Sequence, residues 1–480
     1  MTEQRSIAAK DEELLPPVRR ALASLSLSML LSSLGTSIAN VGLPTLAQAF
    51  DASFQEVQWV VLAYLLAITT VIVSVGWLGD LAGRRRLLLA GIFLFTTASV
   101  LCAIAPALWL LIVARAAQGL GAAIMMALTM AFVGDTVPKA RTGSAMGLLG
   151  SMSAVGTALG PSLGGILIAR SGWPAIFVLN VPLGILAFVL ACRYLPADRP
   201  APAAGRPGFD HAGTLLLALT LAAYALAMTV GRGSFGVLNL ALLSAAAAGA
   251  GLFVFVESGT AAPLIRPVML RDPALSGSLA MSALVSTVVM ATLVVGRFYL
   301  ARVLGLDAAS VGLVLSAGPV AAALTGVPAG RMADRFGAQR MTIAGLIGMA
   351  AGCIALALLP AALGIPGYVA PIIVITAGYA LFQTSNNAAV MTDIRADQRG
   401  LVSGMLNLSR NLGLISGASL MGAVFALASA ATDIRTAHPQ AIAAGMRVTF
   451  AVAAGLVLVA LAIGAGSRFL SRRARPQPSC

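Results

Sequence analysis

Long apolar stretches alternate with short polar segments along the whole chain. About fourteen of these stretches are long enough for a helix that crosses a bilayer, which needs about 20 residues. They cover residues 20–48, 57–79, 87–105, 108–133, 142–168, 175–194, 211–230, 237–256, 275–301, 309–329, 341–360, 367–391, 400–428 and 445–467. Because backbone groups in lipid must find hydrogen bonds within the protein, the pattern predicts an all-α polytopic membrane protein.

Composition supports a membrane-embedded chain. Hydrophobic residues make up 59% of the 480 residues and charged residues 10%, against roughly 25% charged in soluble proteins. So few charges cannot cover the surface of soluble domains, and the apolar content excludes disorder. The net charge of +14 comes from basic residues in short clusters between the apolar stretches. We therefore expect contact with the lipid bilayer and no nucleic-acid partner.

Basic residues are unevenly shared between the two sides of the predicted membrane. With the N-terminus inside, 23 of the 31 Lys and Arg residues fall on the inner side and 6 on the outer side, while Arg115 and Arg410 lie within spans. Positive residues favour the cytoplasmic side. The bias predicts a multi-pass protein of the plasma (inner) membrane with both termini in the cytoplasm.

The chain repeats itself at nearly one offset. Gly76, Asp80, Gly83 and Arg86 return 254 positions later as Gly330, Asp334, Gly337 and Arg340. Five further glycines return 257 positions later: Gly143, Gly147, Gly156, Gly160 and Gly165 recur as Gly400, Gly404, Gly413, Gly417 and Gly422. We expect two homologous six-helix halves, at residues 20–194 and 275–467, around a site near the membrane midplane.

The remaining segments lie outside these halves. Residues 211–256 predict two inserted central membrane helices, and the Pro-rich residues 195–210 predict a cytoplasmic linker before them. Residues 1–19 and 468–480 are expected to be cytoplasmic tails.

A distinctive polar string follows the second apolar stretch. It reads Gly76-Trp77-Leu78-Gly79-Asp80-Leu81-Ala82-Gly83-Arg84-Arg85-Arg86. Its glycines allow a tight turn and close helix approach, and its aspartate can accept hydrogen bonds from a helix N-terminus or pair with an arginine. A plain basic stop-transfer loop needs neither this Gly/Asp/Gly frame nor its return in the second half. The string resembles the loop 2–3 signature of the major facilitator superfamily.

Three further motifs strengthen the resemblance. The family's Arg-x-x-Gln-Gly signature is similar to Arg115, Gln118, Gly119 and Gly121 in the fourth stretch. Its Gly-Pro antiporter signature is similar to Gly156, Gly160, Pro161, Gly164 and Gly165 in the fifth stretch. The first stretch carries Leu34 through Pro44. With fourteen spans, these motifs resemble the fourteen-span drug:proton antiporter branch, which implies a major facilitator fold.

The resemblance also implies a function. We expect a secondary active transporter that exports small amphipathic molecules, drugs or metabolites, by alternating access and is driven by the proton gradient. We expect a monomer that needs no cofactor. An uptake symporter or an uncoupled facilitator of the same fold remains the alternative.

Polar side chains within several stretches predict a wet cavity shared by the halves. A charge at the membrane centre costs roughly 2.5–3.5 kcal/mol, so Arg115 and Arg410 are favoured as functional residues. For any single polar stripe, hydrogen bonding between neighbouring helices is the alternative. The predicted substrate-binding residues are Thr36, Ser37, Asn40, Tyr64, Arg115, Gln118, Gln383, Asn386, Asn387, Asn407 and Arg410.

A second set of residues is expected to control the change between conformations. Opposite charges at predicted inner span ends can hold one state and release in the other. Glycines permit close packing, and a proline can bend a helix. The predicted gating residues are Gly76, Asp80, Gly83, Arg84, Asp135, Gly156, Gly160, Pro161 and Asp334.

The chain departs from the branch at Gly35. The branch usually has an aspartate directly after the leucine of the span-one motif, and no Asp or Glu lies deep in any predicted span. A cation in a cavity that holds Arg115 and Arg410 would meet only like charge, so we expect a preference for neutral or anionic solutes. Restoring an aspartate at Gly35 is expected to move the preference toward cations.

The sequence contains few of the residue patterns that enzymes use for catalysis. The only histidines are His211 and His438, which argues against a histidine metal site. The only lysines are Lys10 and Lys139, and neither lies in a P-loop. A membrane-embedded transferase remains a remote alternative, although it would need clustered catalytic carboxylates or histidines.

Overall fold

The computed structural model describes residues 16–198, 210–229, 236–260, 263–265, 267–358, 360–429 and 438–474. Every regular element in these ranges is helical. Thirteen helices are long and apolar enough to cross a membrane, and a bent helix over residues 139–171 makes a fourteenth span. The predicted all-α fold with about fourteen spans is therefore confirmed.

The first half contains seven helices that form six spans. Helix α7 (Ala175–Val178) leads into α8 after a break of one residue, and the two form one span. The others are α2 (Pro16–Ala49), α3 (Phe54–Ala82), α4 (Arg84–Ala103), α5 (Leu108–Thr136), α6 (Thr142–Ser171) and α8 (Asn180–Tyr194), with the 3-10 turn η1 (Lys139–Arg141) before α6.

The second half has the same plan. Helices α13 (Ala308–Leu315) and α14 (Ala317–Phe336) share one span. The others are α12 (Pro273–Arg302), α15 (Ala338–Leu358), α16 (Gly364–Asp393), α17 (Arg399–Ala428) and α18 (Pro439–Ala474). Short turns α11 (Pro267–Leu270), η2 (Ala361–Leu363) and η3 (Ala396–Gln398) connect them.

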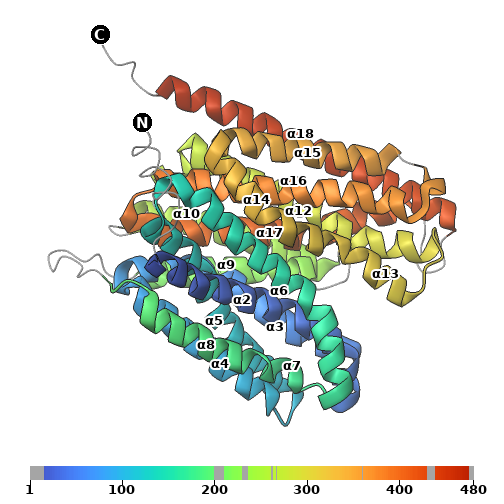
Figure 1. Ribbon diagram of the computed structural model, residues 1–480, viewed down its shortest axis with the longest axis horizontal. Coiled ribbons are helices and arrows are strands. Elements are labelled where there is room, and N and C mark those ends of the chain that lie inside the picture. Colours follow the sequence, from blue (N-terminus) through green and yellow to red (C-terminus); the bar gives the residue numbers. More distant parts are fainter. Residues whose placement is uncertain are drawn as a thin grey trace, which may run out of the picture.

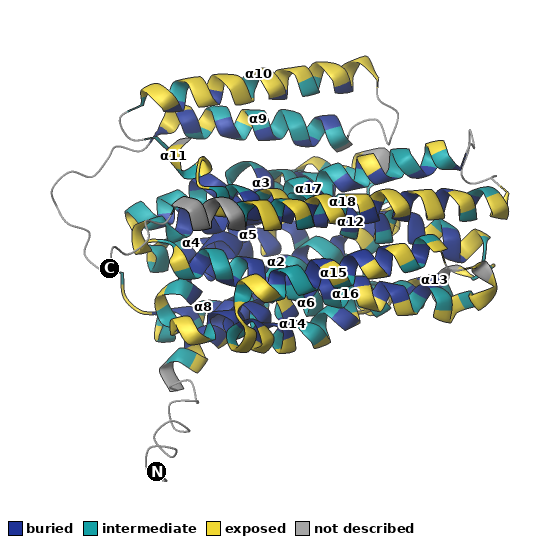
Figure 2. Cartoon of the chain, turned by 90° about the horizontal axis from the view of Figure 1, so that it is seen from above, coloured by how far each residue is buried: buried dark blue, intermediate teal, exposed yellow. Residues whose placement is uncertain are grey.

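Two inserted helices, α9 (His211–Thr229) and α10 (Val237–Gly259), lie along the outside of the bundle. Figure 2 shows α10 outermost, with most of its outer face exposed. Helix α9 packs on α3 of the first half and on α17 of the second half. The Ser419 hydroxyl donates to the Met228 carbonyl at 2.6 Å, and Tyr224 and Ser416 share a hydrogen bond, so α9 is bonded to the second half.

Both described chain ends lie at one end of the bundle, which we name the terminal end (Figure 1). It holds the start of α2, the end of α3, the start of α6, the end of α14, the start of α17 and the end of α18. The helices here run further than the apolar pattern predicted. Asp80 lies inside α3, and Gly83 alone separates α3 from α4. The polar string thus forms the end of α3 and the start of α4, which Gly83 connects.

The repeat is visible in the backbone at this turn. Gly83 has φ of 107° between α3 and α4, and Gly337 has φ of 90° between α14 and α15. Residues with a side chain rarely adopt this region, so glycine is required at both positions. The same short turn therefore joins equivalent helices in the two halves.

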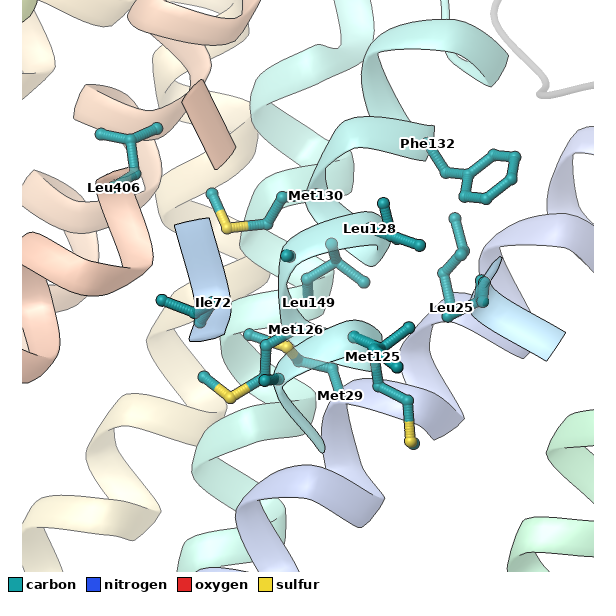
Figure 3. Packing of buried hydrophobic residues seen from close by; sticks show 14 of the residues in the cluster. Leu25, Met29, Ile72, Met125, Met126, Leu128, Met130, Phe132, Leu149 and Leu406 are labelled. Atoms are coloured by element: carbon teal, nitrogen blue, oxygen red, sulfur yellow. The ribbon is translucent and has the colours of Figure 1, made fainter. Parts of the chain in front are cut away.

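Buried apolar side chains form one large cluster at the centre of the first half that extends into the second (Figure 3). It brings together Met29 of α2, Met130 of α5, Leu149 of α6 and Leu406 of α17. Lipid is as apolar as these side chains, so dispersion contacts and close helix approach hold such a bundle together. The cluster therefore joins the two halves.

Candidate functional site: a cavity between the two halves

A cavity of about 220 Å³ lies between the two halves. Helices α2, α5 and α6 of the first half and α12, α13, α14, α16 and α17 of the second half line it. Met29, Met130, Leu149 and Leu406 line it and also belong to the cluster of Figure 3. The cavity is therefore bounded on one side by apolar packing that joins the halves.

The two walls of the cavity differ in chemistry. The first half contributes mainly Met29, Met130, Met146 and Leu149, with the hydroxyls of Ser153 and Thr157. Methionine side chains are flexible and polarisable, so they adapt to varied apolar shapes. The second half contributes apolar side chains such as Val289, Leu315 and Ile372 together with most of the polar lining residues. These polar residues are Thr292, Tyr368, Thr376, Tyr379, Gln383, Thr384, Asn387, Asn407 and Arg410. An amphipathic molecule can satisfy both walls at once.

Two polar groups of the second-half wall have no hydrogen-bond partner among the described residues. The Gln383 amide donates to Asn387 Oδ1 at 2.9 Å, while Gln383 Oε1 has no hydrogen-bond partner among the described residues. Arg410 Nε is also buried and unpartnered, and no described carboxylate forms an ion pair with Arg410. No Asp or Glu is among the described lining residues. A bound solute could satisfy these groups.

The structure separates the predicted cavity residues into two groups. Gln383, Asn387, Asn407 and Arg410 line the cavity. The residues predicted for the cavity that do not line it are Thr36, Ser37, Asn40, Tyr64, Arg115, Gln118 and Asn386.

Local hydrogen bonds explain the position of the polar residues of α2 and of Asn386. Thr36 and Asn40 donate to the carbonyls of Ser32 and Thr36 one turn earlier, at 3.2 and 3.1 Å. Ser37 donates to the Gly156 carbonyl of α6 at 3.0 Å. Asn386 is buried and donates to the Ser278 carbonyl of α12 at 3.3 Å. These residues bond within or between helices.

Arg115 is fully buried inside the first half. Its Nε donates to the Val60 carbonyl at 2.9 Å, another guanidinium nitrogen donates to Gln118 Oε1, and the third nitrogen has no described partner. The guanidinium lies over the Tyr64 ring, 4.2 Å from its centroid. Gln118 in turn donates to the Ser99 hydroxyl at 2.7 Å. Arg115 is thus enclosed by α3, α4 and α5, without a described carboxylate beside it.

Gly35 faces this same interior. A Cβ at Gly35 would lie 3.1 Å from the Tyr64 hydroxyl and 3.3 Å from the Phe95 ring. Position 35 therefore points toward Tyr64 and Phe95 and does not line the cavity, so the geometry does not support the expected shift toward cations with an aspartate there.

At the terminal end, Asp80 joins the two halves. Its carboxylate accepts the backbone N–H groups of Gly400 and Leu401, the start of α17, at 3.0 Å each. The side chain is only 5% exposed, and Arg84 donates to it at 2.9 and 2.6 Å. A carboxylate at a helix N-terminus satisfies orphan N–H groups and the helix dipole, so α3 is held against α17.

A series of ion pairs between side chains extends this contact. Arg84 also pairs with Asp135 and donates to the Ala396 carbonyl of the second half. Asp135 in turn accepts from Arg399 of the second half at 2.6 Å. The predicted gating residues Asp80, Arg84 and Asp135 are thus brought together, and Arg399 completes the series.

Asp334 makes the equivalent contact on the other side of the bundle. It accepts the backbone N–H groups of Gly143 and Ser144, at the start of α6, at 2.7 and 2.8 Å, and the Ser144 hydroxyl at 2.5 Å. The residues equivalent to Arg84 and Arg399 are Ala338 and Thr142. Each contact uses an aspartate, but only the contact of Asp80 is extended by ion pairs with Arg84 and Arg399.

Glycines allow the halves to touch through their backbones at the terminal end. A Cβ at Gly76 would lie 2.1 Å from the Gly400 oxygen, and one at Gly147 would lie 2.2 Å from the Gly326 oxygen. Gly156 and Gly160 of α6 instead approach α2. Helix α6 bends by 40° between Gly160 and Ser162; the side chain of Pro161 lies outside the described residues.

Sequence reasoning missed three features of the site. Arg399 directly precedes Gly400, one of the repeated glycines, but the charge pattern marks it only as one of the basic residues on the inner side. Asp198 accepts the N–H groups of Arg85 and Arg86 at 2.8 and 3.1 Å and caps α4. The methionine wall was also missed, because methionine in a membrane helix carries no distinguishing pattern.

Comparison with known proteins agrees with this architecture. The family profile of the Major Facilitator Superfamily matches residues 25–418 and, separately, 279–479. The "Uncharacterized transporter YebQ" of Escherichia coli is 33% identical over 408 residues, which cover 85% of this chain and 89% of the relative. The "Multidrug resistance protein Stp" of Mycobacterium tuberculosis is 31% identical over 422 residues, covering 86% and 76%.

A solved structure shares the fold. The human organic anion transporter MFSD10 has a TM-score of 0.66 and 15% identity, covering 94% of this chain and 100% of that one. The matched profile extends over more than half of the sequence. The chain is therefore a multi-pass membrane transporter that belongs to the Major Facilitator Superfamily, in the branch that includes the multidrug-resistance proteins it matches.

Proposed function

We propose that this chain is a secondary active exporter of small amphipathic molecules that works by alternating access. One observation carries the proposal: a cavity with a mainly apolar first-half wall and a mixed second-half wall, which holds most of the polar side chains, lies between two halves that are bonded together at one end. A site between two such halves can be exposed to each side in turn when the halves rock.

The contacts at the terminal end support an assignment of the conformation. The excess of Lys and Arg on this side favours the cytoplasm. We therefore propose that the structure is the state closed to the cytoplasm, with Asp80 and Asp334 as the two latches. Inward opening would break both sets of contacts with the starts of α17 and α6.

The cavity favours small neutral or anionic solutes. Its volume of about 220 Å³ is below the roughly 300–1,000 Å³ typical of ligand pockets. Arg410 is the one charged residue among the described lining residues. At an effective dielectric near 20, a cation 4 Å from Arg410 is repelled by ~4 kcal/mol, whereas an anion is attracted.

The proton gradient is the proposed driving force. The relative named as a multidrug resistance protein supports export as the direction. The lining contains no described carboxylate, so the proton carrier would lie outside the cavity.

Purified protein in liposomes tests the proposal. An imposed pH gradient should drive protein-dependent movement of an anionic dye but little of a cationic dye of similar size, and protein-free liposomes are the control. Counterflow without a gradient separates transport from coupling. No protein-dependent movement of any dye in either assay would refute the transporter proposal. Net dye movement that is the same with and without the imposed pH gradient would refute proton drive.

A further inference from the structure

Arg410 stands apart from the other arginines described at the halves' interface. Arg84 and Arg399 are paired with carboxylates, and Arg115 is enclosed in the first half. Arg410 lines the cavity, its Nε is buried without a partner, and no described Asp or Glu lines the same space. A fixed positive charge thus belongs to a cavity that must close at both ends during the cycle.

Closing such a cavity has an electrostatic consequence. While the cavity is open, bulk water solvates the guanidinium; when it is occluded, only the water held in about 220 Å³ remains, and no described carboxylate compensates the charge. A buried charge is unfavourable unless its hydrogen bonds are accepted, as those of Arg115 are by Val60 and Gln118, and a hydrogen-bonded anion also compensates the charge itself. The occluded state is therefore reached more easily when an anion is bound than when the cavity is empty.

The neighbours of Arg410 cannot replace that anion. Asn407, one turn earlier, donates to the Ser403 carbonyl, and its amide is neutral. Gln383 offers a free Oε1, again without charge. The second-half wall supplies hydrogen bonds to a solute but no compensating charge.

We infer that Arg410 enables this protein to exchange anions: in the absence of a driving ion, the carrier reorients readily with an amphipathic monoanion on Arg410 and slowly when empty. The inference rests on the proposed function and concerns the return step, whichever ion drives export. The anion binds with its charge on the second half and its apolar body on Met29, Met130 and Met146 of the first half.

Exchange is tested with p-toluenesulfonate, an aromatic monoanion whose charge does not titrate. Influx of labelled probe is measured into liposomes that contain either unlabelled probe or only gluconate. We expect internal probe to raise influx at least tenfold, equivalent to about 1.4 kcal/mol in the return barrier. Arg410→Gln should reduce this stimulation below twofold, and Arg410→Lys should retain most of it.

Arg297 provides the matched control. It is exposed on α12 and outside the cavity lining, so Arg297→Gln should keep the wild-type stimulation. Thermal unfolding of each variant in detergent, with and without p-toluenesulfonate, measures folding and binding: the probe should stabilise wild type but not Arg410→Gln.

Three results would overturn the inference. One is equal influx with and without internal probe in the wild type; another is stimulation that survives in a folded Arg410→Gln protein. Absence of both binding and movement of the probe in the wild type would also overturn it. The proposed function fails separately, if no dye of any charge moves.

Discussion

Replacing Asp80 by Asn should weaken the contact between the two halves at the terminal end and favour its open form. The carboxylate accepts two N–H groups from α17 at 3.0 Å each, and it also pairs with Arg84. Asparagine has nearly the same shape but only one acceptor oxygen and no charge. The variant therefore loses one bond between the halves and weakens the other.

The size of the effect follows from these bonds. A hydrogen bond to a charged group contributes roughly 1.5–3 kcal/mol, and a neutral one about 0.5–1.5 kcal/mol. The closed terminal end should lose at least ~2 kcal/mol, which is about 30-fold in its equilibrium with the open form. Arg84 keeps its partner Asp135, so folding and membrane insertion should stay near normal.

Spin labels at the exposed positions Lys139 and Arg340, one in each half, report the opening. Distance distributions from pulsed electron resonance should shift from one short distance to a mixture dominated by longer ones, and dye transport should fall sharply. Asp334→Asn should open the same end, because Asp334 makes the equivalent contact with α6.

The control is Asp397→Asn at the same end. Asp397 is 60% exposed and pairs only with the neighbouring exposed Arg395, a contact worth about 0–1 kcal/mol. It should leave distances and transport unchanged. Wild-type distances and transport in Asp80→Asn would show that Asp80 does not act as a latch.

Three further outcomes are expected. Gly76→Ala should reduce vesicle transport more than tenfold, because its Cβ would overlap the backbone of α17, while Gly165→Ala, which meets no atom within 4 Å, should transport normally. Gly35→Asp should leave the preference between anionic and cationic dyes unchanged, and a clear gain of cation efflux would place position 35 in the substrate path. Reporter fusions after Arg86 and after Arg475 should both give cytoplasmic signals, and an external signal at either point would reverse the topology.

The apolar pattern was sufficient for the fold class. A bilayer requires a long apolar helix for each crossing, so the number of spans follows from the number of long apolar stretches. Helix ends were less predictable: α3 runs to Ala82 and α18 to Ala474, past the apolar stretches that indicated them. Polar residues continue a helix beyond the membrane, because helix formation does not depend on hydropathy there.

The repeated Gly/Asp/Gly frame marked the residues at the terminal end. Asp80 and Asp334 were visible because a rare acid recurred at a fixed offset, and both contact the start of a helix in the opposite half. The repeat also marked the partners Gly143 and Gly400, but not their contacts with the aspartates. These contacts use backbone N–H groups, which every residue except proline has and no side-chain pattern reveals.

Only the tertiary structure distinguished Arg115 from Arg410. In the sequence both are lone arginines within apolar stretches, each with an amide side chain one turn away. Arg115 lies over Tyr64 inside the first half, whereas Arg410 lines the cavity. Helical periodicity tells which residues share a face, but each helix in a bundle has several neighbours. Which neighbour a face meets depends on packing of helices far apart in the chain, and so the sequence determined the set of polar residues while the fold decided which of them a substrate can reach.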